Sequence, residues 1–177
     1  MSDTQLKLVL GALTAVLFLG AIALNELLFA SFEFARGISW VYLPAGVRLL
    51  CTLLFAEAGA LGILFASWFI CLFYFFPDDP IRSFAGGILA ALAPYLTYRA
   101  LTAGRIDSSL AGLGPWRLLG CAAAFSVASP ALHHMWFALQ GQREGLLDGF
   151  LVMASGDFVG TLVVLYTAKL VLFMRGR

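Results

Sequence analysis

The sequence predicts an all-α fold: a polytopic membrane helical bundle of about six transmembrane helices with both termini in the cytoplasm. The chain has 177 residues, of which 62% are hydrophobic and only 12% are charged. A soluble domain averages about 45–50% apolar and about 25% charged residues, so a water-soluble core cannot hide this much apolar surface. The apolar residues fall into long runs with short connectors. Residues 1–177 are therefore predicted to form a single integral membrane domain.

Six apolar runs approach or exceed the roughly 17–25 residues that a helix needs to cross a bilayer. They cover Leu6–Ala30, Trp40–Phe55, Ala58–Phe76, Ile81–Leu101, Pro115–Leu139 and Leu146–Met174. The first run is rich in glycine and alanine, which allow close contact between helices. The second begins with amphipathic aromatic residues. The connection Ala56–Gly59, between the second and third runs, is too short for anything but a tight helical hairpin. The fourth and fifth runs contain Pro94 and Pro130, and the sixth is long enough to begin in the membrane interface.

Orientation follows from the basic residues, which gather on the cytoplasmic side of membrane proteins. With both termini in the cytoplasm, that side holds Lys7, Arg99, Arg105, Arg117, Arg175 and Arg177. The outer side holds Arg36, Arg82 and Arg143, diluted by most of the acidic residues. This bias favours an even number of spans. We expect a multi-pass protein of the bacterial inner (plasma) membrane.

Two opposite charges lie deep in the predicted spans at similar depth. At about 1.5 Å per residue, Arg48 sits roughly 12 Å below the outer end of the second span, and Asp157 sits roughly 15 Å below the outer end of the sixth. Opposite charges in hydrocarbon usually pair or line a water-filled cavity. We therefore predict that these side chains meet, either as a structural ion pair that fixes helix register or as the centre of a ligand or ion site.

The outer half of the bundle gathers four further candidates for ligand binding: Asn25, Glu26, His133 and His134. An interfacial, hydrogen-bonded structural role is the alternative for Glu26. Adjacent helical residues point about 100° apart, so the two histidines cannot easily bind one metal ion, and the chain holds no third histidine. The sequence therefore predicts no metal site and identifies no cofactor.

Four small or kinking residues are predicted to shape helix packing around the two charges: Pro44, Gly46, Gly156 and Gly160. Proline and glycine free backbone groups that neighbours or water must satisfy, which suits a cavity wall, although Pro44 is also explained as a helix start. Gly156 and Gly160 flank Asp157 and let a neighbouring helix approach the backbone closely. The sequence holds no recognisable catalytic motif, so we do not expect an enzyme.

The stretch Trp40-Val-Tyr-Leu-Pro-Ala-Gly-Val-Arg-Leu-Leu, followed by the turn at Glu57-Ala-Gly, resembles the opening of membrane-associated sensor domains of the first MASE class. The segment from Gly156-Asp157 to Leu162 is similar to the aspartate-glycine helix of the same family. The resemblance covers about residues 38–173. Those domains are multi-span input modules in front of bacterial histidine kinases and diguanylate cyclases. They usually have about eight spans and an output domain, whereas this chain has six predicted spans and no such domain.

The resemblance implies a stand-alone sensor or regulatory module that signals through another membrane protein or a cytoplasmic partner. Its ligand is expected to be small, to enter from the outer side and, given Arg48, to be anionic. A substrate-capture subunit of an energy-coupling-factor transporter is one alternative, because such subunits pair with a coupling subunit through small residues like Gly11, Ala12 and Ala15. A structural or assembly subunit is the other. The bilayer is the expected surrounding, and a net charge of +1 without a basic run excludes nucleic acid as a partner.

Overall fold

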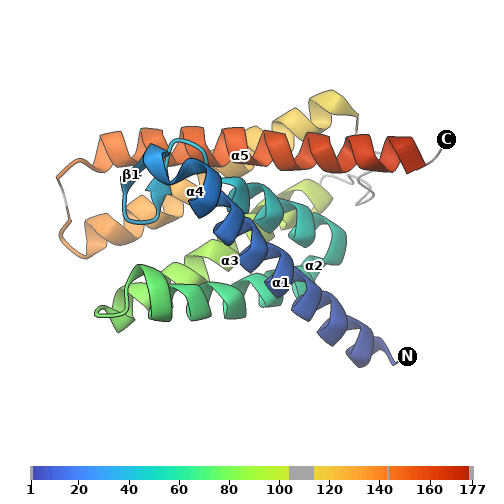
Figure 1. Ribbon diagram of the computed structural model, residues 1–177, viewed down its shortest axis with the longest axis horizontal. Helices are drawn as coiled ribbons and strands as arrows, with labels where there is room; N and C mark the ends of the chain where they lie inside the picture. The colour runs from blue at the N-terminus through green and yellow to red at the C-terminus, as the bar shows by residue number, and fades with distance from the viewer. Residues whose placement is uncertain (1, 104–113, 143, 176–177) are drawn as a thin grey trace.

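The computed structural model describes residues 2–103, 114–142 and 144–175, and within them the fold is almost entirely helical (Figure 1). The helices are α1 (Asp3–Phe29), α2 (Leu43–Ile70), α3 (Pro80–Ala103), α4 (Pro115–Leu139) and α5 (Leu146–Arg175). A 3-10 turn, η1 (Ala30–Phe32), follows α1, and a π-helical turn, η2 (Cys71–Phe75), follows α2. The all-α prediction is confirmed. Three basic residues used in the orientation argument lie outside the described residues: Arg105, Arg143 and Arg177.

The connector between α1 and α2 holds a short antiparallel hairpin that the sequence does not predict. Its strands are β1 (Glu33–Ala35) and β2 (Ile38–Ser39). Gly37 makes the turn between them with a φ of 79°, in the left-handed region that favours glycine, and its N–H donates to Glu33 Oε1 at 3.0 Å. We call the end of the bundle that carries this hairpin the hairpin end.

Helix α2 consists of two arms, because the chain turns back on itself at Ala56 (Figure 1), where φ is 49° and ψ is −123°. Gly59 permits this turn. A Cβ there would collide with the carbonyl oxygen of Cys51 and would lie 3.1 Å from the amide nitrogen of Thr52. The tight helical hairpin predicted at Ala56–Gly59 is therefore present.

The first arm of α2 begins at Leu43, whereas the predicted span begins at Trp40. The Tyr42 N–H donates to the carbonyl oxygen of Gly156 at 3.2 Å, which holds the preceding residues extended along α5. Pro44 lies in the first helical turn, where its missing N–H leaves no hydrogen bond unmade. The predicted helix start at Pro44 is thus correct, and the aromatic residues before it belong to the connector.

Gly156 and Gly160 bring α5 against this extended backbone, whereas the sequence predicts a helix as their neighbour. A Cβ on Gly156 would collide with the carbonyl oxygen of Ser39, and a Cβ on Gly160 would collide with that of Tyr42. A helix is also close, because a Cβ on Gly46 in α2 would lie 2.7 Å from the Gly160 carbonyl oxygen. These close approaches place the face of α5 between the two glycines directly beside the start of α2.

Helix α1 packs on the second arm of α2 through small residues. A Cβ on Gly62 would collide with the carbonyl oxygen of Gly11 and would lie 2.8 Å from Thr14 Cβ. Ala15 is half-buried against the adjacent core, and Ala12 is exposed. Of the three small residues that a coupling subunit is expected to contact, two are therefore already engaged inside the chain.

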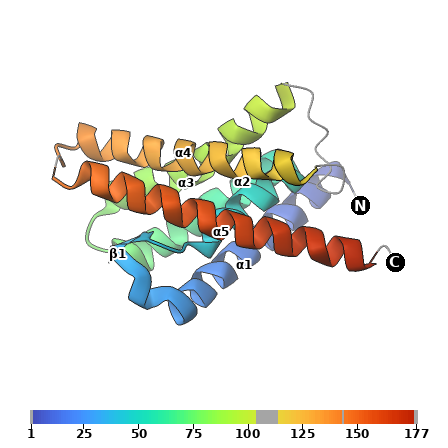
Figure 2. The same cartoon turned by 90° about the horizontal axis from the view of Figure 1, so that it is seen from above.

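Four helical stretches of the described residues are long and apolar enough to cross a membrane: Asp3–Phe32, Leu43–Phe75, Pro115–Leu139 and Leu146–Met174. Helix α3 covers the predicted fourth span but is not among them. Helix α1 begins and α5 ends at one end of the bundle, and the β-hairpin and the α4–α5 connection lie at the other (Figure 2). Much of the surface of α1 and α5 is exposed and apolar, as is expected of helices that face lipid.

Candidate ligand-binding cavity beside Arg48

The predicted charge pair is present and deeply buried. Arg48 Nη2 lies 3.4 Å from each carboxylate oxygen of Asp157 and 3.5 Å from Ser129 Oγ. Arg48 is 2% exposed and Asp157 is 0% exposed. The contacts tie the first arm of α2 to α4 and α5. All three contacts are made by Nη2. They are longer than the roughly 2.7–2.9 Å of a strong charge-assisted hydrogen bond, so this nitrogen is held only loosely.

Two aromatic rings flank the Arg48 guanidinium. Its central carbon lies 5.7 Å from the centroid of the Tyr42 ring and 5.4 Å from that of Phe125, within the range of cation–π attraction. Arg48 Nε, by contrast, has no hydrogen-bond partner among the described residues. A buried donor without a partner costs about 1–3 kcal/mol, so this atom marks a place where a ligand or water is needed.

Arg48 also lines a cavity of ≈ 80 Å³, which is large enough for water molecules or a small anion. The polar part of its wall comprises Arg36, Arg48, Arg82, Tyr42, Ser67, Cys71 and His133. No acidic side chain of the described residues lies on this wall, since Asp157 is not part of it. Like Arg48 Nε, Ser67 Oγ and Arg82 Nε find no hydrogen-bond partner in the described part of the chain. Three unpartnered polar atoms therefore belong to residues of a single cavity.

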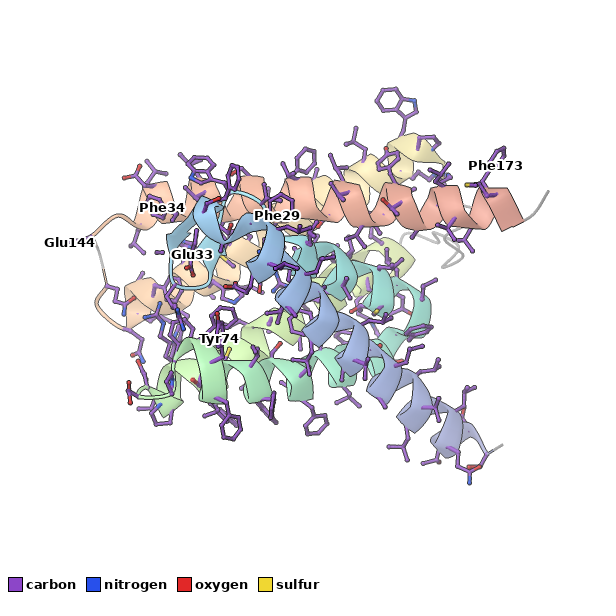
Figure 3. The ribbon with its side chains drawn as sticks, viewed as in Figure 1. Phe29, Glu33, Phe34, Tyr74, Glu144 and Phe173 are labelled. Carbon is purple, nitrogen blue, oxygen red and sulfur yellow. The ribbon has the colours of Figure 1, made fainter. Side chains whose placement is uncertain are left out.

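The other two arginines reach the cavity from the hairpin end. Arg36, in the turn between the strands, donates from Nη2 to the carbonyl oxygen of Tyr74 at 2.9 Å, and its guanidinium carbon lies 4.9 Å from the Tyr74 ring. Tyr74 lies below Glu33 of the hairpin in the view of Figure 3. Arg82, in the first turn of α3, lies 4.1 Å from the centroid of the Phe76 ring and 5.4 Å from that of Phe137. The ion pairs found among the described residues include neither arginine. Their contacts are with aromatic rings and, for Arg36, with one carbonyl group, while the charge of Asp79 also acts on Arg82.

The two histidines have different surroundings, as their angular separation predicts. His133 lines the cavity, whereas His134 packs edge-to-face on Phe150. Each Nδ1 lies within hydrogen-bond distance of a carbonyl oxygen four residues earlier, 2.8 Å from that of Ser129 and 2.9 Å from that of Pro130. Because a carbonyl oxygen only accepts, each Nδ1 carries its hydrogen, and Nε2 is the acceptor of a neutral ring.

Asn25 and Glu26 lie outside this cavity, so the six predicted ligand residues do not form one site. Asn25 is 3% exposed, and its Oδ1 accepts the N–H of Leu43 at 2.9 Å, which caps the start of α2 from another helix. Glu26 Oε2 accepts the Tyr74 hydroxyl at 3.2 Å. Two of the six line the cavity: Arg48 and His133. Depth along a helix, on which the grouping rested, does not say which face a side chain occupies.

We expect Asn25→Ala to lower the free energy of unfolding by about 1 kcal/mol, within the roughly 0.5–2 kcal/mol that loss of a helix cap costs. The substitution removes the acceptor of the Leu43 N–H and leaves that donor buried. Unfolding by SDS in mixed micelles measures the change. Leu24→Ala, at a position 47% exposed on the same helix, is the matched control and should cost less. Equal losses for the two variants would contradict the capping role.

From the sequence, Arg36 and Arg82 are predicted only to be basic residues of the outer connectors, whereas in the structure both line the cavity. A signal for them was present, because both stand on the side that the positive-inside bias disfavours for basic residues. Ser67 and Cys71, in the second arm of α2, gave no such signal, since nothing in an apolar run marks the face that meets the cavity.

No protein-family model matches the chain, and comparison with curated proteins and with solved structures gives no match either. The fold defines an all-helical protein with helices of membrane-spanning length. The resemblance to the MASE sensor modules stays a prediction. The feature of the structure that bears on function is the cavity beside Arg48.

Proposed function

We propose that this protein is a multi-pass protein of the bacterial inner membrane that binds a small anionic ligand, from the outer side, in the cavity beside Arg48. The composition of the cavity wall carries the proposal: three arginine residues line it, and among the described residues no acidic one does. Arginine is the side chain best suited to planar carboxylate or phosphate groups. Arg48 Nε, Arg82 Nε and Ser67 Oγ have no hydrogen-bond partner among the described residues, so three residues of this wall carry polar groups that the protein itself leaves unsatisfied.

The size and the remaining wall of the cavity limit the ligand further. A volume of ≈ 80 Å³ suits a few non-hydrogen atoms, such as a short-chain carboxylate or a small inorganic anion. The apolar part of the wall includes five aromatic residues: Phe18, Phe75, Phe76, Trp136 and Phe137. These rings keep bulk water away from the guanidinium groups, which strengthens their attraction for an anion.

Arg48 supplies a route by which binding changes helix packing, as a sensor or regulatory module requires. One nitrogen contacts Asp157 on α5 and Ser129 on α4, while Nε has no partner among the described residues. An anion in the cavity competes with Asp157 for the same positive charge and loosens the tie between α2 and α5. A ligand shifts an equilibrium only by its difference in affinity for the two states, and this competition provides one. A membrane or cytoplasmic partner at the opposite end of the bundle then receives the change.

The proposal includes six crossings and cytoplasmic termini, with both arms of α2 and helix α3 counted as spans. The start of α1 and the end of α5 lie at the same end of the bundle (Figure 2), which supports an even count. Residues 43–55, the first arm of α2, extend about 20 Å, less than the roughly 30 Å of a hydrocarbon core. The extended backbone before Leu43 completes that crossing. Such backbone is tolerated at membrane depth when protein covers it, and here α5 does so through Gly156 and Gly160.

Small anions are expected to raise the Tm of the purified protein in detergent. At ten times its Kd a ligand adds about 1.4 kcal/mol to the unfolding free energy. For a chain of this size that is a rise of about 3–6 °C. Formate, acetate, nitrate, bicarbonate and phosphate are compared at constant ionic strength, so that general screening is the same in every sample. Tryptophan fluorescence follows unfolding, and Trp136 on the cavity wall makes it sensitive to the site.

Two charge-neutralising variants test whether the rise comes from the cavity. Arg82→Gln removes a positive charge from the wall, whereas Arg117→Gln removes one from an exposed position at the start of α4. We expect the anion-dependent rise to shrink in the first variant and to persist in the second. The same rise in both variants, or none in the wild type with any anion, would refute the anion site.

Uptake measurements separate this proposal from the two alternatives. A transporter subunit would move the stabilising anion into vesicles together with its coupling subunit, whereas a sensor would only change the output of its partner. An assembly subunit would show no anion dependence at all. The internal contacts of Gly11 and Ala15 engage two of the three small residues on which the transport alternative relied.

A further inference from the structure

The cavity adjoins a polar hollow at the hairpin end of the bundle, with which it shares wall residues. This hollow, which we call the vestibule, has a volume of ≈ 280 Å³ and is lined by Asp79, Arg82, Trp136, Phe137, Gln140 and Gln142. Three of these residues also line the cavity: Arg82, Trp136 and Phe137. The vestibule therefore meets the cavity at Arg82, and its other side chains are those of an aqueous surface.

A second hollow approaches the cavity from the lipid side but shares less with it. This lipid-facing groove, of ≈ 620 Å³, is lined by Leu72, Pro80, Ile81, Phe84, Ala85, Ile88 and Trp136. Trp136 is the single residue that it has in common with the cavity. Its wall is apolar and carries no group to balance a charge, so an anion would lose its hydration there without compensation. The groove is an unsuitable path for an anion.

Arg82 is positioned to control the boundary between vestibule and cavity. It is half-buried, its guanidinium lies over the rings of Phe76 and Phe137, and its Nε has no hydrogen-bond partner among the described residues. The carboxylate of Asp79 lies nearby, since its Oδ1 accepts the backbone N–H of Arg82 at 2.9 Å, and its negative charge acts on the Arg82 guanidinium without forming an ion pair with it. The side chain is thus held by ring contacts, which a passing anion can replace with a stronger charge-assisted bond.

We propose that Arg82 is the entrance residue of the cavity: it admits small water-soluble anions from the aqueous vestibule, whereas the apolar lipid-facing groove offers them no path. This inference rests on the anion-binding function proposed above and adds the path and the residue that selects for charge. A positive group at the mouth of a narrow, low-dielectric passage raises the local concentration of anions and repels cations.

Cys71 supplies a reporter on the cavity wall, and the other two cysteines do not line the cavity. The reagents are iodoacetate and iodoacetamide, which are matched in size and differ in charge. With either reagent the Cys71 sulfur, having lost its proton to water, forms a bond to the methylene carbon as the carbon–iodine bond breaks and iodide leaves. The full chain with Cys51→Ser and Cys121→Ser is used, reconstituted in liposomes. The iodoacetate-to-iodoacetamide rate ratio is divided by the same ratio for a small neutral thiol, N-acetylcysteine amide, in the same buffer.

We expect this normalised ratio to be roughly 10 or more in the folded protein, at the low end of the 10–10³ range for charged clefts. Arg82→Gln should lower the ratio roughly tenfold, while Arg82→Lys, which keeps the charge, should preserve it within about twofold. Ile88→Trp, which narrows the lipid-facing groove, serves as the control and should leave both rates unchanged. SDS unfolding of each variant shows that a lost preference is not a lost fold.

The outcomes distinguish this inference from the function on which it rests. If anions stabilise the wild type but the ratio is unaffected by Arg82→Gln, the anion site stands and the entrance at Arg82 is refuted. A slower reaction in Ile88→Trp, or no reaction of folded Cys71 with either reagent, refutes it as well. A wild-type ratio near one, together with no anion-dependent rise in Tm, refutes the anion-binding function itself.

Discussion

Replacing Arg48 by methionine should destabilise the protein by about 3–5 kcal/mol, the largest effect that we expect from any single substitution. Asp157 is 0% exposed, and Arg48 provides its ion pair. Methionine keeps much of the volume of arginine but leaves the carboxylate buried without its counter-charge. SDS unfolding in mixed micelles gives the loss of free energy. A loss below about 1 kcal/mol, the usual worth of an exposed pair, would show that water already solvates this carboxylate.

The partner variants separate the ion pair from the ligand site. Asp157→Asn should cost less than Arg48→Met, because the remaining guanidinium still lines the cavity, where an anion from solution can replace the lost carboxylate. The stability of Asp157→Asn should therefore rise more steeply with a stabilising anion than that of the wild type. The double variant should cost less than the sum of the two single variants by about 0.5–3 kcal/mol, as expected for residues in contact. Additive losses would mean that the two charges do not interact.

Much of the fold could be predicted because a bilayer leaves few options for a backbone. Long apolar runs must be helical, which fixes α1, α4 and α5 to within a few residues. The turn at Ala56 was predictable because so short a connection allows only a helical hairpin. The meeting of Arg48 and Asp157 was predictable as well, since two opposite charges at one depth in hydrocarbon have strong reason to pair.

The composition of the candidate site could not be predicted, because it depends on which face of each helix meets which neighbour. A single sequence does not carry that information. Asn25 is polar and deep enough to suggest a ligand contact, yet it caps α2 because α1 crosses the start of that helix. Gly156 and Gly160 have the spacing of a helix–helix contact, yet they meet extended backbone as well as the start of α2. Arg82 joins the cavity only because α3 begins beside it, which no periodicity in the chain foretells.

Gly160→Ala should destabilise the protein by about 1–3 kcal/mol, although alanine is the better helix former. The new Cβ would collide with the carbonyl oxygen of Tyr42 and would lie 2.9 Å from the Leu43 amide nitrogen. Backbone cannot rotate away as a side chain can, so α5 has to move from the start of α2. That movement would also draw Asp157 from Arg48, and we expect the anion-dependent rise in Tm to change together with stability.

The same substitution at open positions isolates the collision from helix propensity. Gly20 in α1 and Gly120 in α4 have nothing within 4 Å of a built Cβ. Alanine at either should be neutral or should stabilise by up to about 1 kcal/mol. SDS unfolding measures the change in unfolding free energy for all three variants. We expect a loss for the glycine-to-alanine change at Gly160 alone. Stabilisation by Gly160→Ala would mean that the extended segment before α2 can move away from α5. The close packing of α5 on the start of α2, which positions Arg48 beside the cavity, would then be contradicted.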